Sequence, residues 1–259
     1  MESLILKGNK SDFTVCQNSI KLDPTKNYEA GLSSLVTCNS IPNINEGKNN
    51  IFSYSTDNGE TWKNIALLTE SYELIAINNE IQRHMISNGD SGDAIDIEEN
   101  ISRLTSIVNI KNPTYKVNFG VSNSIGSVLG FGAKQIGPGY NESPNIVKIM
   151  QVNTILVNLD IIMGCCVNGL PSPTIYSFYP NVSPGYTIVV ERPKQKYYPI
   201  SRYDINRIRV WLTDQHGNLI DLREEEITIY IDIREAVPRN INQEILKELR
   251  EINNCIKNK

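Results

Sequence analysis

The sequence predicts an all-β protein, a sandwich or a barrel, interrupted by two helices. Apolar and polar residues alternate with a period of two along most of the chain, which is typical of half-buried strands. These runs are short, and Gly, Pro, Asn and Asp separate them. With 259 residues, 40% of them hydrophobic and 21% charged, the chain is long enough to bury a substantial core.

The strongest strand signal is ITIYIDI at Ile227–Ile233, where four isoleucines point to one face. Ile208–Leu212 alternates in the same way, and the turn residues Gly217 and Asn218 lie between the two runs. We therefore expect a hairpin, with Leu219–Leu222 as a short intervening strand. Earlier strands are expected at Leu4–Lys7, Phe13–Leu22, Tyr28–Asn39, Ile51–Ser55, Trp62–Leu67, Ala94–Ile97, Leu104–Ile110, Tyr115–Phe119, Val147–Ile161, Thr174–Phe178 and Tyr186–Val190. Val147–Ile161 is the longest and most apolar, as a central strand would be.

One amphipathic helix is expected over about residues 71–87, with Ser71 as its N-cap. Its apolar face is formed by Leu74, Ile77, Ile81 and Met85. A single helix inserted in a β-domain usually covers a sheet edge or the open end of a sandwich.

A second helix is expected after Pro238, where Asn240 and Gln243 have the spacing of a capping box. Its apolar residues step by 4, 3 and 4 positions, which is a short coiled-coil register. These residues are Ile245, Leu249, Ile252 and Ile256. Such a helix would be marginal alone in water.

The segment STDNGETW, Ser55 to Trp62, resembles the Asp-box of sialidases and other β-propellers. The chain holds one copy and is too short for a six-bladed propeller, so a sialidase is not indicated. We expect a hairpin turn in which Asp57 accepts backbone hydrogen bonds, Gly59 takes a positive φ and Trp62 packs beneath the turn.

Charge and hydropathy exclude several classes of partner. The net charge of −4 and a pI of about 5.4 argue against nucleic acid as the main partner. No apolar run is long enough to span a membrane, and the N-terminus lacks a signal-peptide core. We expect a soluble protein, made in the cytosol and not secreted, whose five cysteines are reduced.

The sequence gives no clear sign of an enzyme, a cofactor or a metal site. Of the two histidines, His84 falls on the first helix and His216 in a turn, and neither adjoins a nucleophile motif. The glycines at 126–139 lack phosphate-loop spacing and are expected to end a short helical turn. The acidic residues at 90–99 lack calcium-loop spacing. Carboxylate pairs for glycoside hydrolysis stay open, since their separation is three-dimensional.

Tyrosines crowd together with Pro, Lys and Arg at residues 176–203. Such a mixture suits glycan or nucleic-acid stacking, but Tyr and Arg are also enriched at protein interfaces. The acidity of the chain favours protein contacts, so Tyr197 and Tyr198 are candidate assembly contacts. The second helix adds four more, Ile245, Leu249, Ile252 and Ile256.

The order of several segments resembles minor capsid proteins of Polinton/Maverick elements and adintovirus-like viruses. The similarity covers about residues 4 to 234, and no single segment is diagnostic. The segments are NYEAGLSSL at 27–35, NSIPNI at 39–44, GETW at 59–62, SYE at 71–73, INNEIQ at 77–82, NSIGSVLGF at 123–131, YSFYP at 176–180, IRVWLTD at 208–214 and GNLID at 217–221.

This resemblance implies a penton-like subunit with one jelly-roll β-sandwich. The jelly-roll domain would cover residues 1–236, with the helix at about 71–87 inserted, and residues 237–259 would form a C-terminal amphipathic helix or tail. Five copies would close each fivefold vertex of an icosahedral virion capsid whose faces are built from a major double-jelly-roll capsid protein. The tail would bind a neighbour or the capsid interior, or pack on its own sheet.

Two other functions compete with this one. A carbohydrate-binding or adhesive β-sandwich would use the tyrosine-rich loops to hold a glycan. A jelly-roll hydrolase is the weakest alternative, because the sequence selects no acid/base pair.

Overall fold

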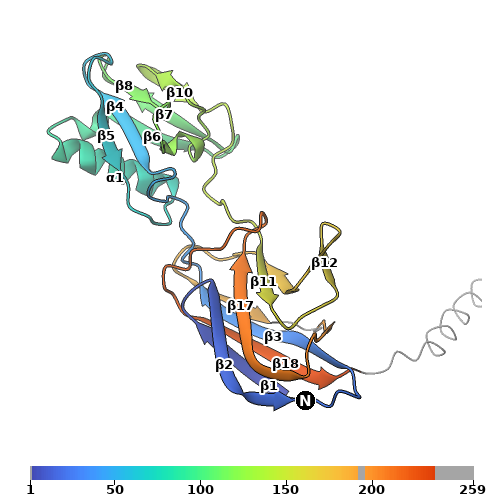
Figure 1. Ribbon diagram of the computed structural model, residues 1–259. Helices are drawn as coiled ribbons and strands as arrows, with labels where there is room; N and C mark the ends of the chain where they lie inside the picture. Colours follow the sequence, from blue (N-terminus) through green and yellow to red (C-terminus); the bar gives the residue numbers. More distant parts are fainter. Residues whose placement is uncertain (1, 192–195, 237–259) are drawn as a thin grey trace, which may run out of the picture.

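The computed structural model describes residues 2–191 and 196–236, which form an elongated molecule with a narrow waist (Figure 1). Two separate clusters of buried apolar side chains lie on the two sides of the waist. One is built from residues 4–41 and 152–233, and the other from residues 44–149. We call these parts the jelly-roll unit and the insertion unit.

The jelly-roll unit is a sandwich of antiparallel strands. Its strands are β1 (Glu2–Gly8), β2 (Asp12–Lys21), β3 (Tyr28–Cys38), β11 (Ile155–Leu159), β14 (Thr174–Phe178), β15 (Thr187–Glu191), β16 (Tyr198–Pro199), β17 (Asp204–Thr213) and β18 (Ile227–Glu235). One sheet has the order β1-β18-β3-β15, with β16 also on β3, and the other has the order β14-β11-β17-β2. A hairpin of β12 (Cys165–Val167) and β13 (Leu170–Ser172) stands out from the side (Figure 1).

The strand pairs are nested from the ends of the chain inward. β1 pairs with β18, β2 with β17, β3 with β15, and β11 with β14, all antiparallel. Folding this four-pair hairpin over on itself also brings β18 beside β3 and β11 beside β17. Two four-stranded sheets connected in this way form a jelly roll. The predicted all-β, single jelly-roll fold is therefore confirmed.

Period-two alternation accounts for the core of this unit. Ile227, Ile229, Ile231 and Ile233 of β18 are all at most 2% exposed, while Tyr230 between them faces outward. On the opposite sheet, Ile208, Val210 and Leu212 of β17 are buried in the same cluster. Full burial of each such side chain contributes about 1.5–3 kcal/mol, which makes the inward faces of β17 and β18 a main source of stability.

The insertion unit lies between β3 and β11 and has two small sheets. One has the order β5-β4-β8-β9, from β4 (Ile51–Ser55), β5 (Lys63–Ala66), β8 (Lys116–Asn118) and β9 (Gln135–Ile136). The other has the order β10-β7-β6, from β6 (Ile95–Asn100), β7 (Thr105–Ile110) and β10 (Gly139–Glu142). Helix α1 (Leu74–Ser87) and two 3-10 turns, η1 (Gly92–Ala94) and η2 (Ile125–Ser127), complete the unit. As predicted, α1 buries Leu74, Ile77, Ile81 and Met85.

Several expectations about the middle of the chain were wrong. The strands between residues 51 and 142 do not join the sandwich, since in the described residues they pair only with one another. Helix α1 is therefore one part of a larger insertion, and it packs in that unit's own apolar cluster. The predicted strand Val147–Ile161 is extended in a sheet only at Ile155–Leu159, because residues 149–152 run from one apolar cluster to the other.

Three local expectations also failed. Ile208–Leu212 and Ile227–Ile233 do not form a hairpin, because β17 and β18 lie in opposite sheets of the sandwich. Ser71 is not the cap of α1: Glu73 occupies the N-cap position, and no side chain caps the helix. Leu219–Leu222 makes only an isolated bridge, Thr213 to Leu219, because Asp214 and Asn218 close a tight turn there.

The predicted division into residues 1–236 and 237–259 stays a prediction. The whole C-terminal segment, with Ile245, Leu249, Ile252 and Ile256, lies outside the described residues.

Candidate functional site

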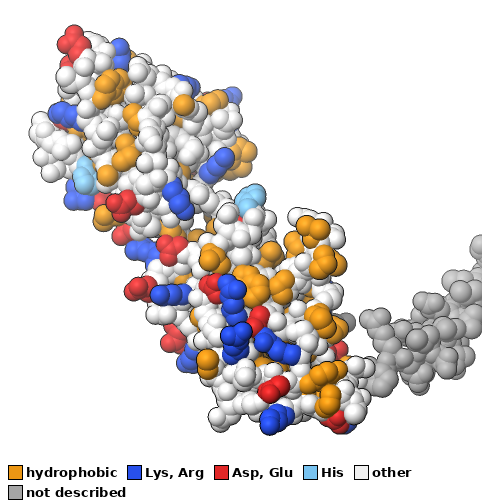
Figure 2. All heavy atoms as spheres, viewed as in Figure 1, with side chains coloured by type: hydrophobic (Ala, Val, Ile, Leu, Met, Phe, Trp, Pro, Cys, Tyr) orange, Lys and Arg blue, Asp and Glu red, His pale blue; other side chains and the backbone are white. Residues whose placement is uncertain are grey.

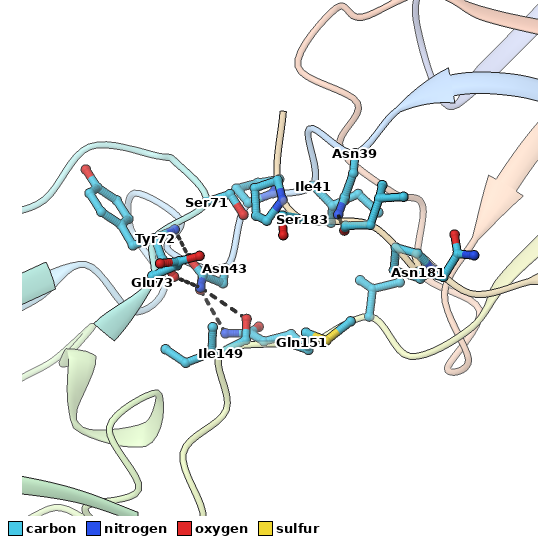
Figure 3. A pocket seen from close by; sticks show the side chains of 16 residues that line it. Asn39, Ile41, Asn43, Ser71, Tyr72, Glu73, Ile149, Gln151, Asn181 and Ser183 are labelled. Carbon is cyan, nitrogen blue, oxygen red and sulfur yellow. Dashed lines mark hydrogen bonds between the residues drawn. The ribbon is translucent and has the colours of Figure 1, made fainter. Parts of the chain in front are cut away.

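The waist consists of two chain segments, residues 39–43 leaving the jelly roll and residues 149–153 returning to it. The Asn43 side chain joins the waist to the insertion unit (Figure 3). Its Nδ2 donates to the carbonyl oxygens of Tyr72 at 2.7 Å and Ile149 at 3.1 Å, and its Oδ1 accepts from the Tyr72 N–H at 2.8 Å. Gln151 Nε2 donates to the Asn43 carbonyl at 2.8 Å. Asn43 is 4% exposed, so these bonds are shielded from water.

Side-chain amides also join the waist to the jelly-roll unit. Asn39 Nδ2 donates to the Val182 carbonyl at 2.7 Å. Gln215 Nε2 donates to the Gln151 carbonyl at 3.0 Å, and Gln215 Oε1 accepts from the Asn153 N–H at 3.1 Å. Each bond satisfies a backbone group that no sheet satisfies, which positions the two segments.

A cleft of about 450 Å³ opens on one side of the waist (Figure 3). The insertion unit contributes residues 71–73, just before α1, and the jelly roll contributes the proline-rich loop 180–184. The apolar lining comes from Ile41, Pro42, Ile149, Met150, Val152 and Val182. Met150 is 62% exposed. The cleft is therefore chemically suited to receive apolar side chains.

A second hollow, of about 840 Å³, lies against the same two segments and the β17 turn. It is lined by charged side chains as well as amides, among them Lys48, Lys148, Asp214 and Asp221. His216, the predicted turn histidine, is exposed at its edge.

Tyr197 and Tyr198, the two predicted assembly contacts in the described chain, lie far from the waist. Tyr198 is in β16, opposite Ala30 at the start of β3. The Arg234 guanidinium lies 3.4 Å from the centre of the Tyr197 ring and donates to Glu29 Oε1 at 2.7 Å. One face of the Tyr197 ring is thus occupied by a cation within the same chain.

The crowded tyrosines do not form one surface. Tyr179 and Tyr186 are 69% and 67% exposed, and they flank the proline-rich loop that lines the cleft. Tyr203 is at the other end of the unit, where its carbonyl accepts from Leu22. Sequence proximity therefore overstated the aromatic cluster.

The outward faces of the two jelly-roll sheets differ in chemistry. On the first, Ile5 is 57% exposed and lies opposite Tyr230, and Val189, 55% exposed, lies opposite Val36. On the second, basic side chains gather over β17 (Figure 2). Arg209 there stacks 5.0 Å from the Trp211 ring and pairs with Asp12.

The Asp-box segment forms the predicted hairpin turn between β4 and β5. The Asp57 carboxylate accepts from the Thr61 N–H at 2.9 Å and from the Ser55 hydroxyl at 2.6 Å. These bonds hold the pKa of Asp57 well below its usual range. Gly59 has φ +91° and lies against the Trp62 ring, as expected. The segment therefore stabilises the turn between β4 and β5.

A polar network beside this hairpin was not predicted. The hydroxyl of Tyr54, which is fully buried, donates to Asp90 Oδ2 at 2.6 Å. Lys63 Nζ donates to both Asp90 oxygens at 2.8 and 2.7 Å, and Asn88 Nδ2 donates to the Tyr54 hydroxyl at 3.1 Å. Burial and the Asp90 hydrogen bond raise the pKa of Tyr54 to about 12. The network joins strands β4 and β5 to the end of α1.

The described part of the chain shows few other features that could bind a metal ion, form a disulfide or enter a membrane. Within residues 2–191 and 196–236, no group of three or more His, Cys, Asp or Glu side chains is arranged to hold a metal ion. Cys16, Cys38, Cys165 and Cys166 are free thiols. No helix within the same ranges is long and apolar enough to cross a membrane.

The class that the topology defines is a jelly-roll protein, an architecture shared by viral capsid proteins, lectins and cupins. No protein-family model and no curated protein matches the sequence. Among solved structures, the chain is similar to the mavirus penton protein, with 10% identity over 91% of this chain and 100% of that chain and a TM-score of 0.47. It is also matched to the D2-D3 domains of the flagellar cap protein FliD from Escherichia coli, with 11% identity over 91% and 100% of the two chains and a TM-score of 0.16. At these TM-scores neither likeness carries an argument about function.

Proposed function

We propose that this protein is a structural virion protein, a penton-like minor capsid subunit. Five copies would close each fivefold vertex of an icosahedral capsid and would contact a major double-jelly-roll capsid protein. The observation that carries the proposal is the complete nested strand order of a single jelly roll, taken with the ordered sequence segments that resemble minor capsid proteins of Polinton/Maverick elements.

The shape of the molecule suits this role. The insertion unit stands off one end of the sandwich (Figure 1), so it does not cover the outer face of either sheet. A β-sandwich with a projecting insertion can pack side by side around an axis while the insertion points away from the shared contact. Closed rings of this kind need two different complementary surfaces on each subunit.

The two outer sheet faces offer such a pair of surfaces. One carries the exposed apolar residues Ile5, Val189 and Tyr230, and the other carries arginines and Trp211 on β17. Tyr and Arg are typical of the centres of protein interfaces. We assign these faces to contacts between neighbouring copies, with Tyr197 and Tyr198 at the rim.

The experiment is the mass of the full chain in solution, measured by light scattering for the unmodified chain and for two variants at exposed positions. Val189→Asp places a charge in the apolar face, and Tyr140→Asp places the same charge on the insertion unit, where Tyr140 is 75% exposed. We expect the unmodified chain and Tyr140→Asp to form the same ring, and Val189→Asp to shift the mass toward the monomer. An unchanged mass for Val189→Asp would refute the assigned face.

A second function, glycan binding, is favoured by Tyr179 and Tyr186. Both rings are exposed beside the waist cleft, where a sugar can stack on one of them. This function predicts binding on a glycan array that is lost on Tyr179→Ala or Tyr186→Ala. Tyr197→Ala is the control, because Arg234 already occupies one face of that ring. No binding by the unmodified chain would eliminate this candidate.

A further inference from the structure

We infer that the waist cleft of one copy receives the C-terminal segment, residues 237–259, of a second copy. The inference rests on the proposed self-assembly and names a contact within it. It follows from the chemistry of the cleft, the chemistry of the segment and the place where the described chain ends.

The cleft has the size and chemistry that an amphipathic segment requires. Its volume of about 450 Å³ lies in the range of sites that enclose a ligand, roughly 300–1,000 Å³. The lining is mainly aliphatic, and Met150 at 62% exposed and Ile149 lie on the returning segment of the waist. The side-chain amides of Asn39 and Asn43, which line the cleft, already form hydrogen bonds with backbone groups, so an apolar occupant would not deprive them of partners.

The C-terminal segment has an apolar stripe that needs a partner. Ile245, Leu249, Ile252 and Ile256 fall on one face of the predicted helix. A helix this short is marginal in water unless its apolar face is buried.

Charge is also complementary between the segment and the rest of the chain. Residues 237–259 contain five of the 25 basic and three of the 29 acidic residues, a net charge of +2. The remaining 236 residues then carry −6. Glu73 lies on the cleft lining and is exposed.

For the start of the apolar stripe, the length of the chain separates the subunit's own cleft from that of a neighbour. The described chain ends at Ala236, just after β18, and the cleft is at the opposite end of this strand, where Thr37 bonds to the Glu226 carbonyl and Asn39 follows. Figure 1 shows the same separation between the end of β18 and the waist. Nine residues of strand span roughly 27–30 Å at ~3.4 Å per residue.

A helix over residues 241–256 cannot bring its whole apolar stripe into the cleft of its own chain. Residues 237–240 reach at most about 14 Å when fully extended, and five helical residues add roughly 7 Å. Ile245 would therefore lie at most about 20 Å from Ala236, short of the cleft, whereas Leu249 and the stripe residues after it would be within reach. The first part of the apolar stripe can enter a cleft only if that cleft belongs to another copy.

The test is photo-cross-linking in the full chain. Met150 is replaced by p-benzoylphenylalanine in unlabelled protein, which is mixed with ¹⁵N-labelled protein before irradiation, and mass spectrometry identifies the joined peptides. We expect unlabelled Met150 peptides joined to ¹⁵N peptides from residues 240–259. Placing the photo-reactive residue at Tyr140, outside the cleft, should give no such product.

A pair of tail variants tests the stripe itself. Leu249→Asp should abolish the cross-link, while Asn254→Asp, which adds the same charge outside the stripe, should retain it. Both positions lie outside the described residues, so neither substitution changes a side chain of the two described apolar clusters.

Two other outcomes would overturn the inference. Tail peptides joined only within chains of one isotope would mean that the segment packs on its own subunit. No tail peptide at all, with light scattering of the same sample still showing a ring, would remove this contact and leave the proposed self-assembly intact. A monomeric mass in that sample would contradict the proposed pentamer instead.

Discussion

Loss of the Asp90 carboxylate should destabilise the insertion unit specifically. In Asp90→Ala the buried Tyr54 hydroxyl loses its acceptor and the Lys63 ammonium loses both of its carboxylate contacts. A buried donor left without a partner costs about 1–3 kcal/mol, and Lys63, which is partly exposed, adds little. We expect the free energy of unfolding of the insertion unit to fall by about 2 kcal/mol, equivalent to roughly 10 °C in Tm for a unit of about 100 residues.

The assay combines thermal unfolding with hydrogen exchange resolved by peptide. Faster exchange in Asp90→Ala should be confined to residues 44–149, because the two apolar clusters are separate. The double variant Tyr54→Phe/Asp90→Ala removes the unsatisfied hydroxyl as well. It should therefore be more stable than the sum of the two single losses predicts, by about 1 kcal/mol.

The reasoning would be refuted if Asp90→Ala changed the free energy of unfolding by less than about 0.5 kcal/mol, or if hydrogen exchange rose equally in both units.

The pH dependence of stability gives a further check. Burial raises the pKa of Asp90, but hydrogen bonds from Lys63 and Tyr54 lower it more, so it lies below 3.8 overall. Its contribution is therefore present above pH 3.8 and is lost as the pH falls through the lower folded value. Asp90→Asn should lack this acid-dependent loss.

The remaining predictions concern single positions. Asp57→Ala should lower the Tm of the insertion unit and remove a stabilisation that is normally lost only on strong acidification, because the pKa of Asp57 is depressed; acid titrations of Tm check this. Gly130→Ala should cost about 3 kcal/mol, since φ is +80° and a Cβ would lie 2.2 Å from the Asn145 carbonyl oxygen, whereas Gly132→Ala, with open space around it, should be neutral; denaturant unfolding compares them. Ile229→Ala should cost about 2–5 kcal/mol and raise exchange only in the jelly-roll unit; equal exchange in the insertion unit would contradict two separate cores.

The sequence predicted most of the strands because their side chains alternate between core and solvent. Ile51–Ser55 and Thr174–Phe178 match the observed bounds, and α1 begins three residues later than expected. Alternation does not specify a partner strand, however. For this reason the strands of the insertion were placed in the same sandwich, although they form a separate cluster.

The waist was not predictable for a different reason. Asn39, Asn43 and Gln151 lie in runs that read as ordinary polar loops, and nothing in the local sequence distinguishes a buried amide from a solvated one. Their roles depend on backbone groups 29 to 143 residues away. Tyr54 and Asp90, 36 residues apart, were missed on the same ground.

The most direct test of the proposed function is the mass of the unmodified full chain by light scattering, with negative-stain images of the same peak. The account predicts a ring of five subunits of 29.2 kDa, about 146 kDa in total. A stable monomer of 29.2 kDa, or a ring with another number of subunits, would contradict it.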